Sequence, residues 1–380
     1  MITTVDRQYY IDWLRLAAVF LLFFFHTACI FHPWSNYYIK NDPLSPLLAY
    51  FFVWAVAHWH MGLFFLLAGA STYYALQKRN GIEYIKERLR RLFIPLIFGT
   101  LVFIPALSYF GLRNHSDYSQ SFITWLPNFF RLQIADLDAF YLGGFTIAHL
   151  WFILHLLIYS VISLPLFLYF NSKRGRRWIQ RIANILINPA VLFLLFPALI
   201  VLINRFPWIA GGNPLFYITF FIIGFILMAD QRLQDKIDRH RLILLLLGVV
   251  PLATSIIMVA TNSWPSNMPQ WVDSIINEYR NAFVPWFFIL ALMAYGRRLL
   301  NFSNKFLGYF VEGAYPIYII HHTMVVTIAF FAVQWSVGVG IKYISIVAFS
   351  FITTFIIYDI LAKQTKITRF LFGMKTKFRK

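Results

Sequence analysis

The chain has 380 residues, of which 60% are hydrophobic, 20% are Phe, Trp or Tyr and only 13% carry a charge. This composition, with a mean hydropathy of +0.65, excludes an ordinary soluble protein and indicates a polytopic membrane protein. The net charge of +18 does not indicate nucleic-acid binding, because the basic residues alternate with apolar stretches instead of forming one patch. The single cysteine, Cys29, excludes a disulfide and a cysteine-ligated metal site.

The first apolar stretch, residues 10–32, is long enough to cross a bilayer, yet it contains Asp12, Arg15 and His26. Ionisable groups at membrane depth are costly, so they face a protein interior or reach the interface. Eleven residues of helix turn through about 1100° and rise about 16 Å, so Arg15 and His26 share one face. Asp12 lies on the same side, where we expect it to neutralise the Arg15 guanidinium.

Ten apolar stretches are expected to form transmembrane helices. They cover residues 10–32, 47–76, 92–112, 149–170, 187–204, 214–229, 242–261, 281–296, 311–332 and 342–362. If the first end is cytoplasmic, 27 of the 33 Lys and Arg residues lie on the cytoplasmic side, as the positive-inside rule requires. We therefore predict an all-α bundle of about ten transmembrane helices, formed by a single domain over residues 1–380. Both termini are cytoplasmic, with short tails at 1–9 and 363–380.

The segments expected outside, 33–46, 113–148 and 262–280, are rich in aromatic, Asn, Ser and Pro residues. Their Trp and Tyr residues suit two interpretations. They form the aromatic belt of the membrane interface, or they line a vestibule for a polar, hydroxyl-rich acceptor.

A basic segment on the cytoplasmic side precedes the third span. Arg88 and Arg91 are three residues apart and share a helix face, which suits the binding of phosphate groups. The alternative is that the segment anchors the chain to anionic lipids.

Histidines mark three of the spans. His60 lies in the outer half of the second span, and His149 opens the fourth, two residues before Trp151. No Asp, Glu or Cys accompanies these histidines at ligand spacing, so we predict no metal site. His149 is expected to cap or line an outer cavity.

The ninth span combines Pro316, Tyr318 and two adjacent histidines, His321 and His322. Tyr318 and His322 are four residues apart and share a face, whereas His321 points about 100° away. At least one of the two histidines is expected to face the protein interior. Pro316 is expected to disturb the helix and free backbone carbonyls, which membrane proteins tolerate beside a cavity or neighbouring helices.

Five short motifs stand in an order that resembles the acyltransferase-3 family of integral-membrane acyltransferases, over nearly the whole chain. They are Arg15 with His26, FFLLAG at 64–69, Arg88 with Arg91, HLWFI at 149–153 and YPIYIIH at 315–321. The likeness is greatest to the glucan biosynthesis protein C branch, whose members are associated with succinylating periplasmic glucans. The chain departs from the pattern at Ala68, where many members have Ser.

The resemblance implies a membrane O-acyltransferase of the cell inner membrane. Its donor would be cytoplasmic acyl-CoA, either acetyl-CoA or succinyl-CoA, and its acceptor a hydroxyl of an extracytoplasmic glycan. Besides the acceptor, the expected partners are membrane lipids and no nucleic acid, and the oligomeric state is open between a monomer and a homodimer.

The catalytic roles expected on this basis centre on His26, acting as general base on the acceptor hydroxyl or as a nucleophile that takes the acyl group. Arg15, held by Asp12, would stabilise charge near the thioester, and His321 or His322 would supply a second proton-handling group or an oxyanion contact.

Binding roles fall to two further groups of residues. The residues expected to bind the CoA phosphates are Arg88 and Arg91, and those expected to contact the acceptor are His149, Trp151, Tyr318 and His60.

A secondary transporter or a lipid-linked sugar flippase is the alternative function, since interior charged groups also serve as gating or proton-coupling groups. The sequence does not divide into two similar halves with matching spans broken by Gly or Pro, which argues against a transporter.

Overall fold

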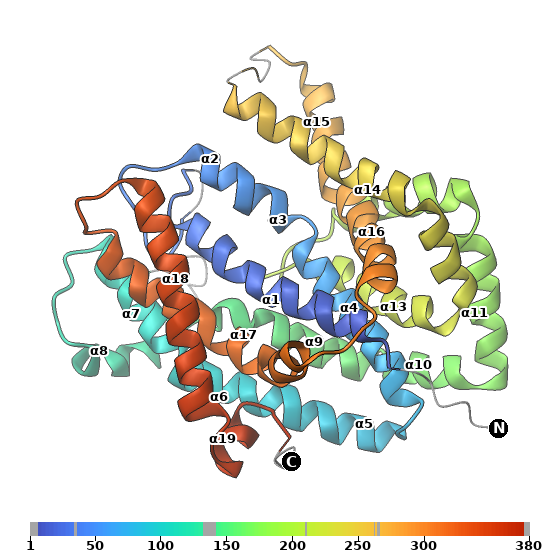
Figure 1. The fold of residues 1–380 in the computed structure, drawn as a ribbon, viewed down its shortest axis with the longest axis horizontal. Coiled ribbons are helices and arrows are strands. Elements are labelled where there is room, and N and C mark those ends of the chain that lie inside the picture. The colour runs from blue at the N-terminus through green and yellow to red at the C-terminus, as the bar shows by residue number, and fades with distance from the viewer. Residues whose placement is uncertain are drawn as a thin grey trace. The chain divides into compact units, whose positions relative to one another are not determined.

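A computed structural model describes residues 7–33, 36–131, 142–209, 211–261, 263 and 267–375. Helices account for 79% of the structure, and Figure 1 shows only coiled ribbons and connecting segments. Apart from an isolated bridge between Ile209 and Gly212, these described ranges contain no β-structure. The predicted all-α class is confirmed.

The backbone divides into two compact units. The first unit comprises the described residues within Met1–Ala18, Ala57–Lys86 and Ile158–Val311. The second unit comprises those within Val19–Val56, Glu87–Leu157 and Glu312–Lys380. Long helices such as α1 (Tyr9–Cys29) and α17 (Lys305–Ala332) contribute residues to both units. The prediction of a single domain over 1–380 stays a prediction.

The first unit contains most of the central part of the chain. Besides the start of α1, its helices are α4 (His60–Leu76), α5 (Gly81–Arg88), α10 (Leu164–Asn171), α11 (Lys173–Leu186), α12 (Phe196–Ile203), α13 (Pro214–Ala229), α14 (Gln231–Ala260), α15 (Gln270–Glu278) and α16 (Val284–Leu299).

The second unit is built mainly from the ends of the chain and the segment 87–157. Besides parts of α1 and α17, its helices are α2 (Pro46–Leu48), α6 (Ile94–Val102), α7 (Ile104–His115), α8 (Phe122–Phe129), α9 (Trp151–Ile162), α18 (Val339–Ile357) and α19 (Lys366–Leu371). The short helix α3 (Ala55–Ala57), α5 and α9 also contribute residues to both units.

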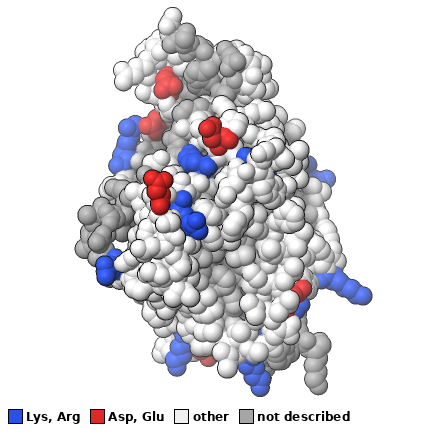
Figure 2. Space-filling view, turned by 90° about the vertical axis from the view of Figure 1, so that its left-hand side faces the viewer, with Lys and Arg blue, Asp and Glu red and all other residues white. Residues whose placement is uncertain are grey.

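Seven helices in the described part of the chain are long and apolar enough to cross a membrane, or up to nine if each of two bent helix pairs is one span. The bent pairs are 148–162 with 164–171, at 49°, and 173–186 with 191–203, at 85°. The predicted span 214–229 coincides with α13, an apolar helix of 16 residues. Figure 2 shows a face that is mostly free of charged side chains, several of which gather in its upper half. The chain is a multi-pass membrane protein, and its ten predicted spans have helical counterparts of unequal length.

Turns of π-helix interrupt several long helices immediately before a proline. They are Leu89–Phe93 before Pro95, Val191–Leu195 before Pro197 and Tyr279–Phe283 before Pro285. Because proline has no backbone N–H and its ring clashes with the carbonyl four residues earlier, the hydrogen-bond pattern widens locally. These turns allow the helix to continue through the proline inside a membrane protein.

Small residues allow α4 and α13 to pack closely within the first unit. A Cβ placed on Gly69 would lie 1.9 Å from the carbonyl oxygen of Phe221, and one placed on Gly224 would lie 2.0 Å from that of Leu66. Only glycine fits at either position. Gly69, in the second predicted span, therefore serves helix packing.

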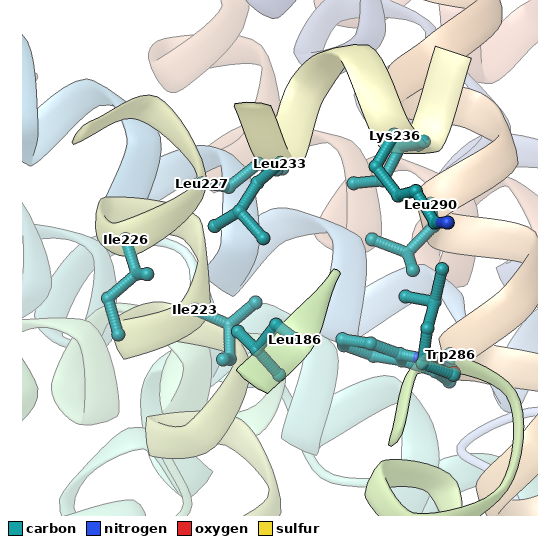
Figure 3. Close-up of a pocket in the computed structure, with 10 residues that line it drawn as sticks. Leu186, Ile223, Ile226, Leu227, Leu233, Lys236, Trp286 and Leu290 are labelled. Carbon is teal, nitrogen blue, oxygen red and sulfur yellow. Dashed lines mark hydrogen bonds between the residues drawn. The ribbon is translucent and has the colours of Figure 1, made fainter. Parts of the chain in front are cut away.

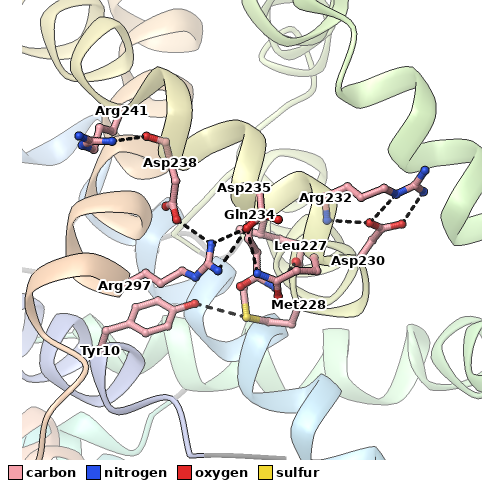
Figure 4. A network of polar contacts seen from close by, with 11 residues as sticks. Tyr10, Leu227, Met228, Asp230, Arg232, Gln234, Asp235, Asp238, Arg241 and Arg297 are labelled. Carbon is pink, nitrogen blue, oxygen red and sulfur yellow. Dashed lines mark hydrogen bonds and ion pairs between the residues drawn. The ribbon is translucent and has the colours of Figure 1, made fainter.

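Ion pairs join the ends of α14 and α16 in the first unit, as Figure 4 shows. The Arg297 guanidinium donates to Asp238 at 2.7 Å and to Asp235 at 3.3 Å. Nearby, the Tyr10 hydroxyl donates to the sulfur of Met228 at 3.5 Å. This network satisfies charges that the positive-inside pattern assigns to the cytoplasmic face.

The C-terminal segment, part of the predicted tail, packs into the second unit. Phe372 lies against Phe98, with ring centroids 5.1 Å apart, and the Arg369 guanidinium forms an ion pair with Glu312. Phe372 and Met374 are each only 3% exposed. These residues therefore belong to the hydrophobic core of the unit.

Candidate active site

Four histidines from three distant parts of the chain come together in the second unit. They are His26 in α1, His149 just before α9, and His321 and His322 in α17. The His26 ring stacks on the His322 ring with centroids 3.9 Å apart and planes at 17°. The centroid of His321 lies 5.3 Å from that of His26, and His149 lies 4.9 Å from His322. The structure thus brings together four of the residues singled out from the sequence.

The exposure of these rings separates one histidine from the other three. His149, His321 and His322 are 7%, 0% and 3% exposed, whereas His26 is half-buried. His26 is thus the least enclosed ring of the cluster, although its Nδ1 is buried.

His149 is held by its backbone neighbours and by α17. Its Nε2 lies 3.1 Å from the carbonyl oxygens of both Tyr318 and Ile319, and the Tyr318 hydroxyl donates to the carbonyl of His149 itself. The preceding residue, Ala148, has a φ of 45°, a left-handed conformation that costs about 1–3 kcal/mol. The chain thus tolerates backbone strain where it presents His149.

Tyr318 and His322 both face His149, as their four-residue spacing predicts. The Nδ1 atoms of His322 and His149 are 3.2 Å apart, within hydrogen-bond distance. One nitrogen must donate and the other accept, so the two rings hold complementary protonation states.

His321 presents a different arrangement of its two nitrogens. Its Nδ1 lies 2.6 Å from the carbonyl oxygen of Tyr318 and must donate the hydrogen bond. Its Nε2 is buried and has no hydrogen-bond partner among the described residues. In a neutral ring, this nitrogen carries the lone pair and can accept a proton.

Tyr37 is a member of the cluster that the sequence did not single out. Its hydroxyl lies 2.7 Å from Nε2 of His322, and burial raises the pKa of Tyr37 well above its ordinary value of 10. The phenol therefore stays protonated. Its only signal in the sequence is a pair of adjacent tyrosines in an outer segment rich in aromatic residues.

The segment that carries Tyr37 is fixed at several points. His115 Nε2 donates to the carbonyl of Tyr37 at 2.7 Å, and the backbone N–H of Lys40 donates to Asn114 at 2.8 Å. The buried Lys342 ammonium donates to the Asn41 side chain at 3.0 Å. This outer segment is thus tied to α7 and to the start of α18.

Arg15 and Asp12 form the predicted ion pair in the first unit, with 3.1 Å between Nη1 and Oδ1. The other carboxylate oxygen of Asp12 accepts from Arg7 at 2.7 Å, and Arg15 also donates to the Ser71 hydroxyl at 2.7 Å. Asp12 and Ser71 therefore hold the side chain of Arg15, which lies on α1, the helix that also carries His26.

Arg88 and Arg91 lie where α5 passes into the π-helical turn, at the start of the second unit. Arg91 pairs with Glu87 at 3.3 Å, and its Nε donates to the carbonyl of Gly373 at 3.4 Å. The Arg91 side chain is 43% exposed, so it remains accessible to an anionic ligand.

The remaining predicted site residues, His60 and Trp151, lie outside the histidine cluster. His60 belongs to the first unit, where its Nε2 donates to the carbonyl of Ala18 at 2.8 Å. Trp151 is half-buried and meets the ring of His155 edge-on at 5.4 Å. Their acceptor-binding roles stay predictions.

A cavity of about 20 Å³ lies in the first unit, with room for a single water molecule (Figure 3). Lys236 is the one charged residue of its apolar lining. This cavity is too small for a substrate. In the described part of the chain, no three His, Cys, Asp or Glu side chains are placed to hold a metal ion.

Known proteins were compared with the chain by sequence and by structure. The model of a family described as "Acyltransferase domain" matches residues 8–363. Glucans biosynthesis protein C of Salmonella paratyphi B, of Salmonella dublin and of Salmonella typhi are each 24% identical over 347 residues, covering 84% of this chain and 82% of the relative. No solved structure gives a significant match. The family match spans nearly the whole chain and includes all four clustered histidines, so the protein belongs to the acyltransferase-3 family of membrane acyltransferases.

Proposed function

We propose that the protein moves an acetyl or succinyl group from cytoplasmic acyl-CoA to a hydroxyl of an extracytoplasmic glycan. The observation that carries this proposal is the histidine cluster, in which the half-buried His26 stacks on His322 and lies beside His321, while His149, His321 and His322 are buried. An imidazole beside other nitrogen bases suits proton transfer or nucleophilic attack in acyl transfer.

Two routes for His26 are consistent with this arrangement. As a general base, it takes the proton of the acceptor hydroxyl while the oxygen attacks the thioester carbon; the C–S bond breaks, and the proton passes to the CoA thiolate. As a nucleophile, its ring nitrogen first takes the acyl group and releases CoA, and the hydroxyl then attacks the acyl-imidazole. A role for Arg15, held by Asp12, in stabilising charge near the thioester stays a separate proposal.

The donor side of the proposal rests on Arg88 and Arg91. Guanidinium groups bind phosphate oxygens with two parallel hydrogen bonds, and CoA carries several phosphates. These arginines belong to a basic segment that the positive-inside rule assigns to the cytoplasm, together with both termini. We propose the cell inner membrane as the protein's location, as the family resemblance implies.

The acceptor side rests on the outer segments and on the names of the relatives. Tyr37 and its neighbours reach the histidine cluster from a segment expected outside, and the relatives carry names that refer to glucans. We assign acceptor contacts in the second unit to His149, Trp151 and Tyr318. The acceptor contact predicted for His60, in the first unit, stays a separate proposal. Membrane lipids are the proposed surroundings, and the oligomeric state is open between a monomer and a homodimer.

The central experiment measures transfer of radiolabelled acetyl-CoA and succinyl-CoA to glycan acceptors by purified protein in lipid nanodiscs. His26→Ala should abolish turnover while the protein remains folded, because it removes the base or nucleophile that both routes require. His240→Ala is the matched control, since His240 lies in the first unit and bonds to the carbonyl of Lys236. Near-normal turnover by His26→Ala would overturn the assignment.

The donor site is tested by charge removal. Arg88→Gln and Arg91→Gln should each raise KM for acyl-CoA by about tenfold, the loss expected for one charge-assisted hydrogen bond to phosphate, and leave kcat nearly unchanged. Arg90→Gln, an exposed neighbour in the same turn, is the control for net charge. Equal effects of all three changes on KM would indicate that the segment attracts the donor only by its overall charge.

A further inference from the structure

We propose that Tyr37 is a positioning residue of the acyl-transfer site: its hydroxyl fixes the protonation state and orientation of His322, on which the His26 ring stacks. This inference rests on the proposed function, because His322 contacts His26, the proposed base or nucleophile of acyl transfer. It goes beyond that function by assigning a role to a residue outside the motifs of the family resemblance.

The first step is the protonation of His149. Its Nε2 faces two carbonyl oxygens, of Tyr318 and Ile319, each at 3.1 Å. A carbonyl only accepts hydrogen bonds, so Nε2 carries the proton. His149 is buried and pairs with no carboxylate in the described part of the chain, so its ring is neutral, since an unpaired buried charge is costly. Its Nδ1 therefore carries the lone pair.

The second step transfers this constraint to His322. Because Nδ1 of His149 accepts, the Nδ1 of His322, 3.2 Å away, must donate. His322 is likewise buried, so its neutral ring has a lone pair on Nε2. The group that faces this lone pair is the Tyr37 hydroxyl at 2.7 Å. A directed chain of hydrogen bonds therefore runs from Tyr37 through His322 and His149 to the backbone of α17.

The third step connects the chain to His26. The His322 ring stacks on the His26 ring with centroids 3.9 Å apart. The orientation of the His322 ring therefore determines how the His26 ring packs. Without the Tyr37 hydroxyl, the buried Nε2 lone pair of His322 loses its donor, and the ring loses one of the two hydrogen bonds that orient it.

Tyr38 provides a matched control. It is adjacent in the chain, buried, and its ring meets the His322 ring edge-on at 5.6 Å. Its hydroxyl, however, hydrogen-bonds with Thr146 and not with His322. Tyr37→Phe and Tyr38→Phe each remove one buried hydroxyl and keep the aromatic ring, and only the first breaks the chain.

The kinetic test uses the nanodisc assay. Tyr37→Phe should lower kcat by about tenfold or more and keep KM for acyl-CoA within about twofold, whereas Tyr38→Phe should keep both values near wild type. In a His322→Ala background, Tyr37→Phe should cause no further loss, because Tyr37 acts through His322. Equal effects of the two tyrosine changes, or an additive loss in the His322→Ala background, would overturn the inference.

A second measurement does not depend on turnover. In protein labelled with ¹⁵N-histidine, the His322 signal, assigned by its loss in His322→Gln, should report a protonated Nδ1 and an unprotonated Nε2. Tyr37→Phe should shift the Nε2 signal, and Tyr38→Phe should not. A protonated Nε2 in the wild type would refute the inference. His26→Ala tests the proposed function separately: retained turnover there refutes that function, whereas lost turnover with a silent Tyr37→Phe refutes only the role of Tyr37.

Discussion

His321 and His322 are adjacent in the chain and yet their ring nitrogens do different things. His322 uses both nitrogens in hydrogen bonds, to Tyr37 and to His149. His321 uses only Nδ1, and its Nε2 is buried with no partner among the residues that the structure describes. An unpaired buried nitrogen is costly, so its retention beside His26 favours a role in proton transfer.

His321→Gln tests that role, because the Gln amide can still donate to the Tyr318 carbonyl but cannot accept a proton. We expect kcat to fall by about 100-fold, the size of a typical contribution from general acid–base catalysis, with KM for acyl-CoA preserved. Steady-state kinetics in nanodiscs measure both values. A kcat within a factor of two of the wild type would assign His321 to packing alone.

The residues of the site differ in how far the sequence could predict them. Asp12 with Arg15, and Tyr318 with His322, are close in the chain, so helical periodicity predicted their shared faces correctly. Tyr37 and His322 are 285 residues apart in the chain, and no local sequence pattern predicts a contact over that separation. Both His321 and His322 are buried in the protein interior, whereas the sequence predicted this for at least one of them.

Helix packing in the first unit depends on the contact of α4 with α13. Gly224→Ala would place a Cβ 2.0 Å from a backbone carbonyl oxygen, so the helices would have to separate. We expect a loss of about 3 kcal/mol or more in the free energy of unfolding, at the upper end of the cost of overpacking. Thermal unfolding in detergent measures it as a lower midpoint.

Gly308→Ala is the control for that experiment. Gly308 lies in α17, and a Cβ there would meet no atom within 4 Å. Alanine favours a helix over glycine by about 1 kcal/mol, so this change should keep or raise the midpoint. A Gly224→Ala midpoint equal to that of Gly308→Ala would contradict the close approach of α4 and α13.

At the level of elements, the sequence located the helices better than their interruptions. Each predicted span has a helical counterpart, because long apolar runs are strong signals. The bends of 49° and 85° and the π-helical turns before Pro95, Pro197 and Pro285 were not predicted. Proline indicates a disturbance, but neighbouring helices decide whether the result is a bend or a wider turn.

The expected topology of the whole molecule rests on the positions of its basic residues, and it is testable in intact cells. In a Cys29→Ser background, Asp117→Cys lies in a segment expected outside and should react with a membrane-impermeant maleimide. Lys366→Cys should react only after lysis, since the positive-inside rule assigns it to the cytoplasm. Labelling of Lys366→Cys in intact cells would reverse the topology and place Arg88 and Arg91 away from cytoplasmic acyl-CoA.

The packing of the C-terminal segment has a consequence for exchanging parts between relatives. The family match ends at residue 363, whereas Phe372 and Met374, beyond that limit, are buried against the second unit. A chimera that replaces only residues 8–363 by those of a relative would leave these two side chains facing a foreign surface. A chimera should therefore also take from the relative the segment that corresponds to residues 364–374 of this chain. The exchanged part then keeps the residues that complete its own hydrophobic core.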